Sequence, residues 1–504
     1  MGSRAQLAGV LTGVVLTLLV GAGVRTAMVS SRQVAPDGPP SPVDAQKAAE
    51  LVSQAITFPT VSGAGDSSEA FRAFGAWVDE RFPAFVAAAP VVALDLRLDG
   101  ERVGTHARLQ VWQGTDPGLE PVLLLAHQDV VPVEDGTTED WSYPPFSGAV
   151  APCGDWPGDC VWGRGAIDMK LTLVGLAAAA DELASSGWQP RRTLYFWFSD
   201  DEEVGGAASQ ALNARLSADD VRFHYVIDEG LVVTDGLVPG LSQPAALVGI
   251  AEKGYLSAEI IASGEMGHSS MPPPRTAVGA LSRAMASIEA SPFPAAFDGP
   301  AEQMFAHVGP EMKMPEKAVF ANTWLLGDIV LGQLTAARTT NALVRTTQAA
   351  TQLSGSPKDN VLPQQARGVV NLRLHPRDSM DGALAHLRES VAQTGEAVEV
   401  RPLEGAGNTD PSPVSPVDHD GYHTLASSVR RQLPEAIVAP GMFIAATDSR
   451  HLIDRSDAIY RFTPVRMTPE DVGRAHGTDE RVRVDDLGWG FAVLRDVVRE
   501  SGGR

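Results

Sequence analysis

The sequence predicts an α/β protein built on a helix-flanked mixed sheet, with a smaller α+β domain inserted into it. The chain has 504 residues, which exceeds a single ordinary domain and favours two folded units. From about residue 43 to 245, apolar strand candidates alternate with helix candidates, an order typical of a sheet covered by helices. A different order of elements begins near residue 246 and ends near residue 405.

Residues 1–30 are expected to form a separate N-terminal segment. Arg4 precedes an uncharged, mostly apolar stretch over residues 5–24, which is long enough to span a bilayer. The stretch exceeds a usual signal-peptide core and has no Ala-x-Ala cleavage site, so we expect a retained membrane anchor. Arg4 on the cytoplasmic side would place the rest outside the cytoplasm, although Arg25 weakens this charge asymmetry. A cleaved segment would instead leave a secreted or periplasmic protein, with residues 31–44 as a linker.

Polar side chains follow the apolar strands of the first unit, residues 45–245. His127 and Asp129 follow the apolar run 121–126, and the acidic run 200–203 follows strand 192–198. Asp168 comes after a glycine-rich turn and before an alanine- and leucine-rich helix, and Asp228 follows strand 223–227. Because the carboxyl ends of parallel strands share one edge of a sheet, these side chains are predicted to lie together.

A cluster of this composition indicates a metal site. Without a cation, several carboxylates at one sheet edge repel one another, and a buried imidazole among them stays unpaired. Positions 127 and 129 face the same side of an alternating strand, so Asp129 is expected to orient the His127 ring rather than to bind metal. Helix N-capping explains Asp168 alone, and solvent exposure explains His127 alone. Neither explains the whole set.

The inserted unit, residues 246–405, has its own pattern. It predicts a strand over 247–262, a helix over 277–290, a strand over 343–353, a strand over 368–374, a helix over 380–393 and a strand over 398–401. This order indicates a small α+β lid, with an extra segment between residues 291 and 340. The chain then returns through a Gly- and Pro-rich stretch, and residues 406–504 complete the first unit.

These motifs resemble the zinc exopeptidases of metallopeptidase family 20, which includes aminoacylase, carboxypeptidase S and secreted N-acyl amino acid hydrolases. The resemblance runs from about residue 45 to the end, and the extra lid segment is most similar to the carboxypeptidase S branch. It implies a catalytic domain in two parts and a lid of the kind that forms homodimers.

The resemblance also implies a ligand set for two zinc ions per subunit. Asp168 would bridge the ions, His127 and Asp228 would complete one site, and Glu203 and His476 the other. The sequence around His476, Arg-Ala-His-Gly-Thr-Asp-Glu-Arg over 474–481, is similar to the family's His-Gly-Thr-Asn-Glu-Arg signature. Mixed histidine and carboxylate ligands suit zinc, and cobalt or manganese could replace it.

Catalytic and substrate-binding roles follow from the same resemblance. Glu202 corresponds to the general base, and His268 to a lid histidine that helps stabilise the oxyanion, in some members from across a dimer. Three residues correspond to groups that grip the free carboxylate of the substrate: Asn360, Arg373 and, more weakly, Arg450. A guanidinium binds a carboxylate through two parallel hydrogen bonds, although Arg373 taken alone is also explained as a strand-face arginine paired with a surface acid.

The implied reaction is hydrolysis of an amide bond next to a free carboxylate. The main hypothesis is carboxypeptidase-type release of C-terminal amino acids from peptides. The alternative is a hydrolase or synthase of N-acyl, including fatty-acyl, amino acids. A third hypothesis from another class is an inactive binding or scaffold protein on the same fold.

The cysteines and the net charge bear on two remaining questions, the redox environment of the protein and its partners. Cys153 and Cys160 are the only two cysteines and lie in one loop before Asp168. A disulfide suits an exported protein, whereas a reduced pair stays open at this point. The formal net charge of −22 argues against nucleic acid as a partner.

Overall fold

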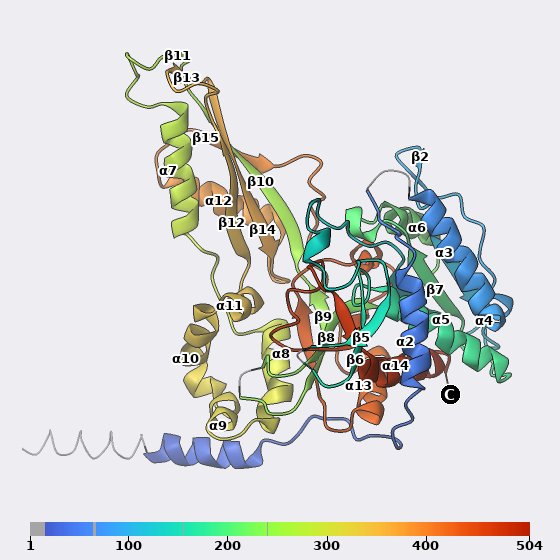
Figure 1. Cartoon of the computed structure of the whole chain (residues 1–504). Helices are drawn as coiled ribbons and strands as arrows, with labels where there is room; N and C mark the ends of the chain where they lie inside the picture. The colour runs from blue at the N-terminus through green and yellow to red at the C-terminus, as the bar shows by residue number, and fades with distance from the viewer. Residues whose placement is uncertain (1–15, 64–66, 155, 239, 504) are drawn as a thin grey trace, which may run out of the picture.

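The computed structural model describes residues 16–63, 67–154, 156–238 and 240–503. Its centre is a seven-stranded sheet with the order β16-β9-β17-β8-β4-β7-β3 (Figure 1). The strands in chain order are β3 Arg108–Trp112, β4 Val122–His127, β7 Leu194–Ser199, β8 Tyr225–Thr234, β9 Ala245–Glu252, β16 Ile437–Phe443 and β17 Ile459–Met467.

The central sheet is mixed, as predicted. Strand β4 pairs in parallel with β7 and β8, and β8 pairs in parallel with β17. Strand β3 runs antiparallel to β7, and β9 runs antiparallel to β8 and β17. The four adjacent parallel strands, β17, β8, β4 and β7, therefore deliver their carboxyl ends to one edge.

Helices cover both faces of this sheet. Alternate residues of β4 face opposite sides: Leu124 joins a core with α2, α5, α13 and α14, whereas Leu123 and Leu125 join a core with α6. Every residue of β4 is buried, which explains why its sequence is continuously apolar rather than alternating. The covering helices are α2 Ala45–Ile56, α5 Lys170–Ser185, α6 Ala207–Ala218, α13 Asp420–Gln432 and α14 Val484–Ser501, with α3 Ser68–Arg81 and α4 Pro83–Ala88 beside them.

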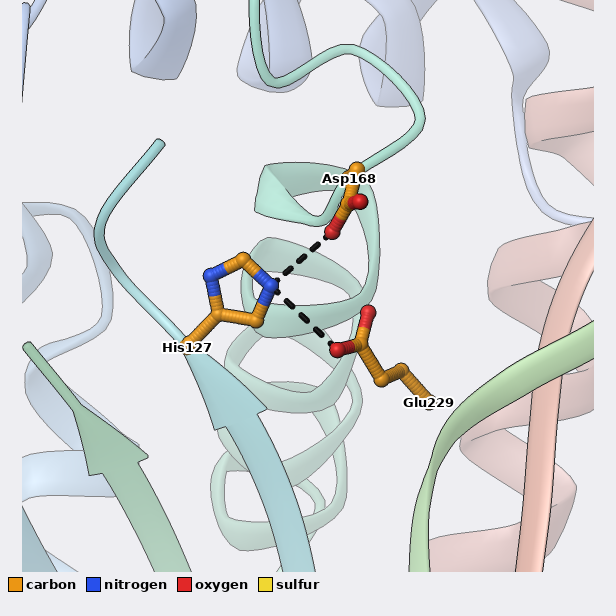
Figure 2. Close-up of side chains that lie close together, drawn as sticks. All are labelled: His127, Asp168 and Glu229. Atoms are coloured by element: carbon orange, nitrogen blue, oxygen red, sulfur yellow. Dashed lines mark hydrogen bonds and ion pairs between the residues drawn. The ribbon is translucent and has the colours of Figure 1, made fainter. Parts of the chain in front are cut away.

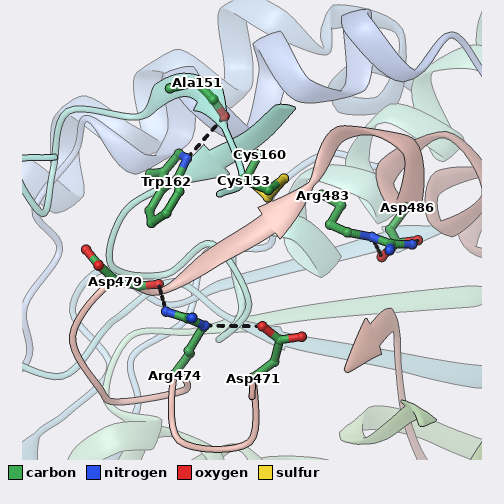
Figure 3. Close-up of a disulfide and its surroundings, with 9 residues drawn as sticks. All are labelled: Ala151, Cys153, Cys160, Trp162, Asp471, Arg474, Asp479, Arg483 and Asp486. Atoms are coloured by element: carbon green, nitrogen blue, oxygen red, sulfur yellow. Dashed lines mark hydrogen bonds and ion pairs between the residues drawn. A yellow bond between two sulfur atoms is a disulfide. The ribbon is translucent and has the colours of Figure 1, made fainter. Parts of the chain in front are cut away.

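A small three-stranded sheet lies beside the central one. It consists of β5 Ala149–Pro152, β6 Asp159–Trp162 and β18 Arg481–Arg483, with β6 in the middle. Cys153 and Cys160 form a buried disulfide across the turn between β5 and β6 (Figure 3), so the open question about this pair is answered. Because β18 pairs with β6, the loop before β18 lies against the turn before α5. A two-stranded ribbon, β1 Arg97–Leu98 and β2 Glu101–Arg102, completes this unit.

The lid is a four-stranded antiparallel sheet in the order β12-β14-β10-β15. Helices α7 and α12 share its apolar core on one face, and Figure 1 shows the lid extending away from the central sheet. At the far end of the lid, β11 Gly267–His268 pairs with β13 Val361–Leu362. The larger elements are β10 Gly254–Ser263, α7 Ala277–Ala290, β12 Thr347–Ser354, β14 Gln365–Leu374, α12 Met380–Ala392 and β15 Val398–Pro402.

The strand predicted over 247–262 is two strands in different sheets. Strand β9 ends at Glu252 in the central sheet, and β10 begins at Gly254 in the lid. At this junction the chain returning from the lid passes so close that a Cβ on Gly254 would lie 2.5 Å from the backbone nitrogen of Pro411. Only glycine fits such an approach, and a continuous apolar pattern did not reveal the break.

The extra segment predicted within the lid packs elsewhere. It forms α8 Gly299–Val308, α9 Glu316–Ala321, α10 Thr323–Ala336 and α11 Arg338–Val344. Its apolar side chains share a core with Ile437 and Ala439 of edge strand β16 and with Leu247 of β9. The segment therefore covers the edge of the central sheet rather than extending the lid sheet.

The N-terminal part lies along this same region. Residues 16–28 form a helix, and residues 1–15, which include much of the predicted anchor, are outside the described residues. Within the described ranges, no helix combines the length and apolar character that crossing a membrane requires. The predicted linker is held on the first unit, because Arg431 pairs with Asp37 at 2.7 Å and the Gln33 amide donates to the Val438 carbonyl.

Candidate metal centre

Five side chains converge where the parallel strands of the central sheet end. His127 is the last residue of β4, and Glu203 lies in a short 3₁₀ helix, Glu202–Val204, directly after β7. Glu229 lies in β8, and Asp168 lies in the turn before α5. His476 comes from the loop between β17 and β18. Local apolar strands thus bring polar residues from five segments to one place.

The convergent side chains form two groups that share Asp168. In the first, Nε2 of His127 lies 2.9 Å from Oδ1 of Asp168 and 3.4 Å from Oε1 of Glu229 (Figure 2). In the second, Nε2 of His476 lies 3.0 Å from Oδ2 of Asp168 and 3.1 Å from Oε2 of Glu203. Asp168 directs one oxygen to each group, which is the arrangement that a carboxylate bridging two ions requires.

The structure places Glu229, not the predicted Asp228, in the first group. Asp228 is buried with its carboxylate turned away: Oδ2 accepts a hydrogen bond from Ser449 N at 2.9 Å, and Oδ1 accepts one from Glu229 N. Successive residues of a strand face opposite sides of the sheet, so only one acid of this adjacent pair can reach His127. Glu229 therefore lies where a ligand of the first ion is needed, and the predicted ligand role of Asp228 stays a prediction.

Asp129 supports two of the convergent side chains. Nδ1 of His127 lies 2.9 Å from the backbone oxygen of Asp129 and 3.4 Å from its Oδ1. The Asp129 carboxylate also accepts hydrogen bonds from the backbone N–H groups of Glu202 and Glu203. Asp129 therefore contacts the His127 ring and fixes the turn that carries both glutamates.

The protein by itself does not balance the negative charges of the centre. Burial, followed by the nearby charge of Asp168, raises the pKa of Glu229, and burial together with Glu229 raises the pKa of Glu202. Hydrogen bonds to Asp168 and Glu203 raise the pKa of His476 to about 10. Without a cation, the acids therefore hold protons or keep the histidines protonated. A bound cation would take the place of these protons.

The residues present fit divalent cations. Each group offers one imidazole nitrogen and two carboxylate oxygens, and the ligand atoms of a group lie within 4.8 Å of one another. Oε1 of Glu203 is buried and has no hydrogen-bond partner within the described part of the chain. Nitrogen and carboxylate donors in this combination are those of zinc and similar divalent ions.

The predicted lid residues His268 and Asn360 are not brought to this centre. Ser269 N donates to the backbone oxygen of Asn360, and Nδ1 of His268 lies 2.8 Å from Oγ of Ser270. Both residues lie at the exposed far end of the lid, beside β11 and β13 (Figure 1). Within one chain, the length of β10 and β14 separates them from the metal centre.

Arg373 lies at the opposite, inner end of the lid, and Arg450 lies in the 3₁₀ helix Asp448–Leu452 of the first unit. Arg373 is on β14, with its guanidinium 4.8 Å from the centroid of the Tyr255 ring. Arg450 donates from Nη2 to the backbone oxygen of Gly205, two residues after Glu203. Burial, reinforced by the charge of Arg450, lowers the pKa of Arg373. Arg450 therefore places positive charge beside the turn that carries Glu203, and Arg373 is close enough to Arg450 to feel its charge.

Comparison with known proteins identifies the family. Residues 123–500 match the profile of peptidase family M20/M25/M40. The chain belongs to this family. The M20 chain is 36% identical over 438 residues to N-fatty-acyl-amino acid synthase/hydrolase PM20D1 of Xenopus tropicalis, covering 86% of this chain and 81% of the relative. It is 32% identical over 442 residues to probable carboxypeptidase S-like 2 of Dictyostelium discoideum, with the same coverage of both chains.

A solved structure shares the fold. The M20 family metallo-carboxypeptidase Sso-CP2 from Sulfolobus solfataricus superposes with a TM-score of 0.61, covering 90% of this chain and 99% of that one at 16% identity. The predicted α/β architecture with an inserted lid is therefore confirmed, and the M20 chain is a metal-dependent hydrolase of the metallopeptidase class.

Sequence reasoning gave no role to Glu480 of this M20 chain. Glu480 is fully buried and accepts a hydrogen bond from Nη1 of Arg164 at 2.7 Å. The other terminal nitrogen of Arg164, Nη2, donates to the backbone oxygen of His476. The Glu480 carboxylate also accepts hydrogen bonds from backbone N–H groups of the turn before α5, namely those of Gly165, Ile167 and Asp168. Glu480 thereby positions both Asp168 and the loop that carries His476.

Replacement of Glu480 by glutamine is expected to destabilise the fold. The amide would place a donor against backbone N–H donors and leave buried Arg164 without its counterion, so we expect the free energy of unfolding to fall by about 3–5 kcal/mol. Urea unfolding of metal-free protein measures this. Exposed Glu470 provides the control, because Glu470→Gln should change stability by less than about 0.5 kcal/mol. Equal stability of the two variants would contradict the positioning role.

Proposed function

We propose that this chain is a dizinc hydrolase that cleaves an amide bond next to a free carboxylate, with carboxypeptidase-type release of C-terminal amino acids as its main activity. The observation that carries the proposal is the sharing of Asp168 between two groups of metal-binding side chains. His127 and Glu229 would hold one ion, and Glu203 and His476 the other. Cobalt or manganese could occupy the same ligands.

The side chains around the ions have distinct tasks. Two bound divalent ions would lower the pKa of a water molecule and polarise the substrate carbonyl. Glu202, held in place through its backbone by Asp129, takes a proton from the attacking water and delivers it to the leaving amine.

Arg373 is proposed to bind the free carboxylate of the substrate, with Arg450 beside it. Arg373→Ala is therefore expected to lower kcat/KM by about 10- to 100-fold, because a charge-assisted hydrogen bond contributes about 1.5–3 kcal/mol. Steady-state hydrolysis of a blocked dipeptide measures this effect. Removal of the substrate's carboxylate by amidation should abolish the difference between variant and parent.

Arg367 is the matched control for Arg373. It lies six residues earlier on β14, has the same side-chain chemistry, and pairs at the surface with Glu259. Arg367→Ala should leave kcat/KM nearly unchanged. Equal losses of kcat/KM in the two variants would show that any such change on β14 impairs hydrolysis. The Arg373 guanidinium would then have no specific role in binding the substrate.

A second candidate activity concerns the acyl side of the amide bond. Hydrolysis or synthesis of N-fatty-acyl amino acids is favoured by the 36% identity to PM20D1 over 438 residues. Rates on a blocked dipeptide and on an N-oleoyl amino acid, compared with the zinc-loaded full chain, distinguish the two activities. Turnover of neither substrate by metal-loaded protein would favour the inactive binding protein instead.

Two further parts of the proposal concern location and assembly. The apolar stretch 5–24 supports attachment to a membrane, with the catalytic part outside the cytoplasm. The exposed position of His268 supports a homodimer formed through the lid, in which this histidine serves the partner's centre. Edge strand β12 is exposed over its last six residues and offers a surface for such pairing.

A further inference from the structure

Helix α10 carries an apolar face that is exposed in the folded chain. One side of the helix is buried, since Val330 and Leu334 join the core shared with strand β16. On the other side, Trp324, Leu325 and Ile329 keep 52%, 42% and 62% of their surface exposed. Leu325 and Ile329 are four residues apart and so lie on one stripe. That stripe continues through Gly332 and Ala336, which are also uncharged and exposed, while exposed Asp328 lies beside it.

The N-terminal helix lies beside the start of α10. The side chain of Asn322, next to the first residue of α10, donates from Nδ2 to the backbone oxygen of Ala22 at 3.2 Å and to Oγ1 of Thr26 at 3.0 Å. A cavity of about 320 Å³ separates the end of the N-terminal helix from α8 and α9, with Met28 and Phe320 among its lining residues. Figure 1 shows both helices at the same end of the molecule.

The N-terminal helix also exposes apolar side chains. Five of its large apolar residues keep more than half of their surface exposed: Leu16, Leu19, Val20, Val24 and Met28. Residues 5–15, which precede it, are uncharged. Exposed Arg25 and Arg32 follow the apolar stretch 5–24, as cations do where a protein meets lipid headgroups. A contiguous apolar surface of this kind marks an interaction site.

We propose that α10 is a second membrane-docking element, and that Trp324, Leu325 and Ile329 insert among the acyl chains of a bilayer beside the N-terminal helix. A bilayer fits better than a protein partner because the adjoining helix belongs to the stretch that sequence assigns to the membrane. Tryptophan beside aliphatic residues is also typical of side chains at a bilayer interface. The inference rests on the proposed membrane attachment and is independent of the proposed reaction.

Docking through α10 has a consequence for orientation. Because α8 to α11 pack on edge strand β16, two contacts with the bilayer would fix the catalytic unit relative to the membrane. The lid shares no core with this segment among the described residues, so it would project away from the contact.

Site-specific fluorescence quenching tests this proposal on the full chain. Both native cysteines are in the disulfide, so a single added cysteine can be labelled selectively. Ile329→Cys and Leu325→Cys would carry an environment-sensitive dye in vesicles of phosphatidylcholine and phosphatidylglycerol with brominated acyl chains. Leu353→Cys, on the lid and 65% exposed, is the matched control. We expect most of the dye fluorescence to be lost at positions 325 and 329 and none at position 353.

Three other outcomes would overturn the proposal. Protein that floats with the vesicles but shows equal quenching at positions 329 and 353 would leave the N-terminal attachment intact and remove α10 from the membrane. Dye protection that depends on protein concentration without lipid would assign the face to a second copy of the chain. Failure of the full chain to float would remove the attachment as well, while the hydrolysis assays would still report separately on the reaction.

Discussion

Replacement of Glu202 by glutamine is expected to lower amide hydrolysis by about 10²-fold or more, because the water would lose its general base and the leaving amine its proton donor. Glutamine preserves the size of the side chain and leaves the backbone hydrogen bond to Asp129 intact. Turnover of a blocked dipeptide at saturating substrate measures the loss. Metal analysis of the same preparation should still find two ions per chain.

The control for this variant is a glutamate remote from the centre. Glu80 is exposed at the end of α3, so Glu80→Gln should hydrolyse the dipeptide at the parent rate. A Glu202→Gln protein that keeps both ions and a near-parental kcat would contradict the assignment of Glu202 as the general base. Loss of an ion from that variant would instead mean that Glu202 serves as a ligand.

Replacement of Asp168 by alanine is expected to remove both ions and to abolish hydrolysis, because one carboxylate oxygen contributes to each group. Glu229→Ala should remove the ion of the first group only. Loss of a residue that only supports a ligand typically lowers metal affinity by roughly 10- to 100-fold. Each of these two variants should lose more metal affinity than that. Ions bound per chain, counted after dialysis against a weak chelator, are the measurement.

Asp228→Asn is the informative comparison, because Asp228 precedes Glu229 directly and is equally acidic. Its carboxylate accepts hydrogen bonds from Ser449 N and Glu229 N, and an asparagine oxygen can keep accepting one of them. We therefore expect Asp228→Asn to retain both ions. If Asp228→Asn lost an ion while Glu229→Ala kept two, the geometric assignment of the first group would be reversed.

Several site residues were accessible to sequence reasoning because their signals are local. These signals are an apolar strand that ends in His127, a glycine turn that ends in Asp168, and a strand followed by Glu203. Each signal spans only a few neighbouring residues of the sequence. The parallel-sheet rule then placed their side chains at one edge. In the structure His127 lies 2.9 Å from Asp168, and Glu203 lies 3.1 Å from His476, which itself contacts Asp168. His476 required the family resemblance, since no local pattern links it to the strands.

Other features depended on contacts between distant segments. Glu480 could be named as part of a motif, but its role follows from hydrogen bonds to residues more than 300 positions away. The extra segment 291–340 was predicted as part of the lid, whereas its helices pack on the central sheet. Its apolar helices needed an apolar partner, and edge strand β16, from the last part of the chain, supplied it.

The sequence by itself determined the α/β class, the existence of an inserted lid, the chemistry of the centre's ligands and the family resemblance. These features follow from hydrophobic periodicity and clustered polar residues, which are properties of neighbouring positions. The tertiary structure decided that Glu229 rather than Asp228 faces His127, that β9 and β10 belong to different sheets, and that His268 lies far from the metal centre of its own chain. Strand facing, sheet membership and the reach of a lid are set by non-local packing, which no single stretch of sequence records.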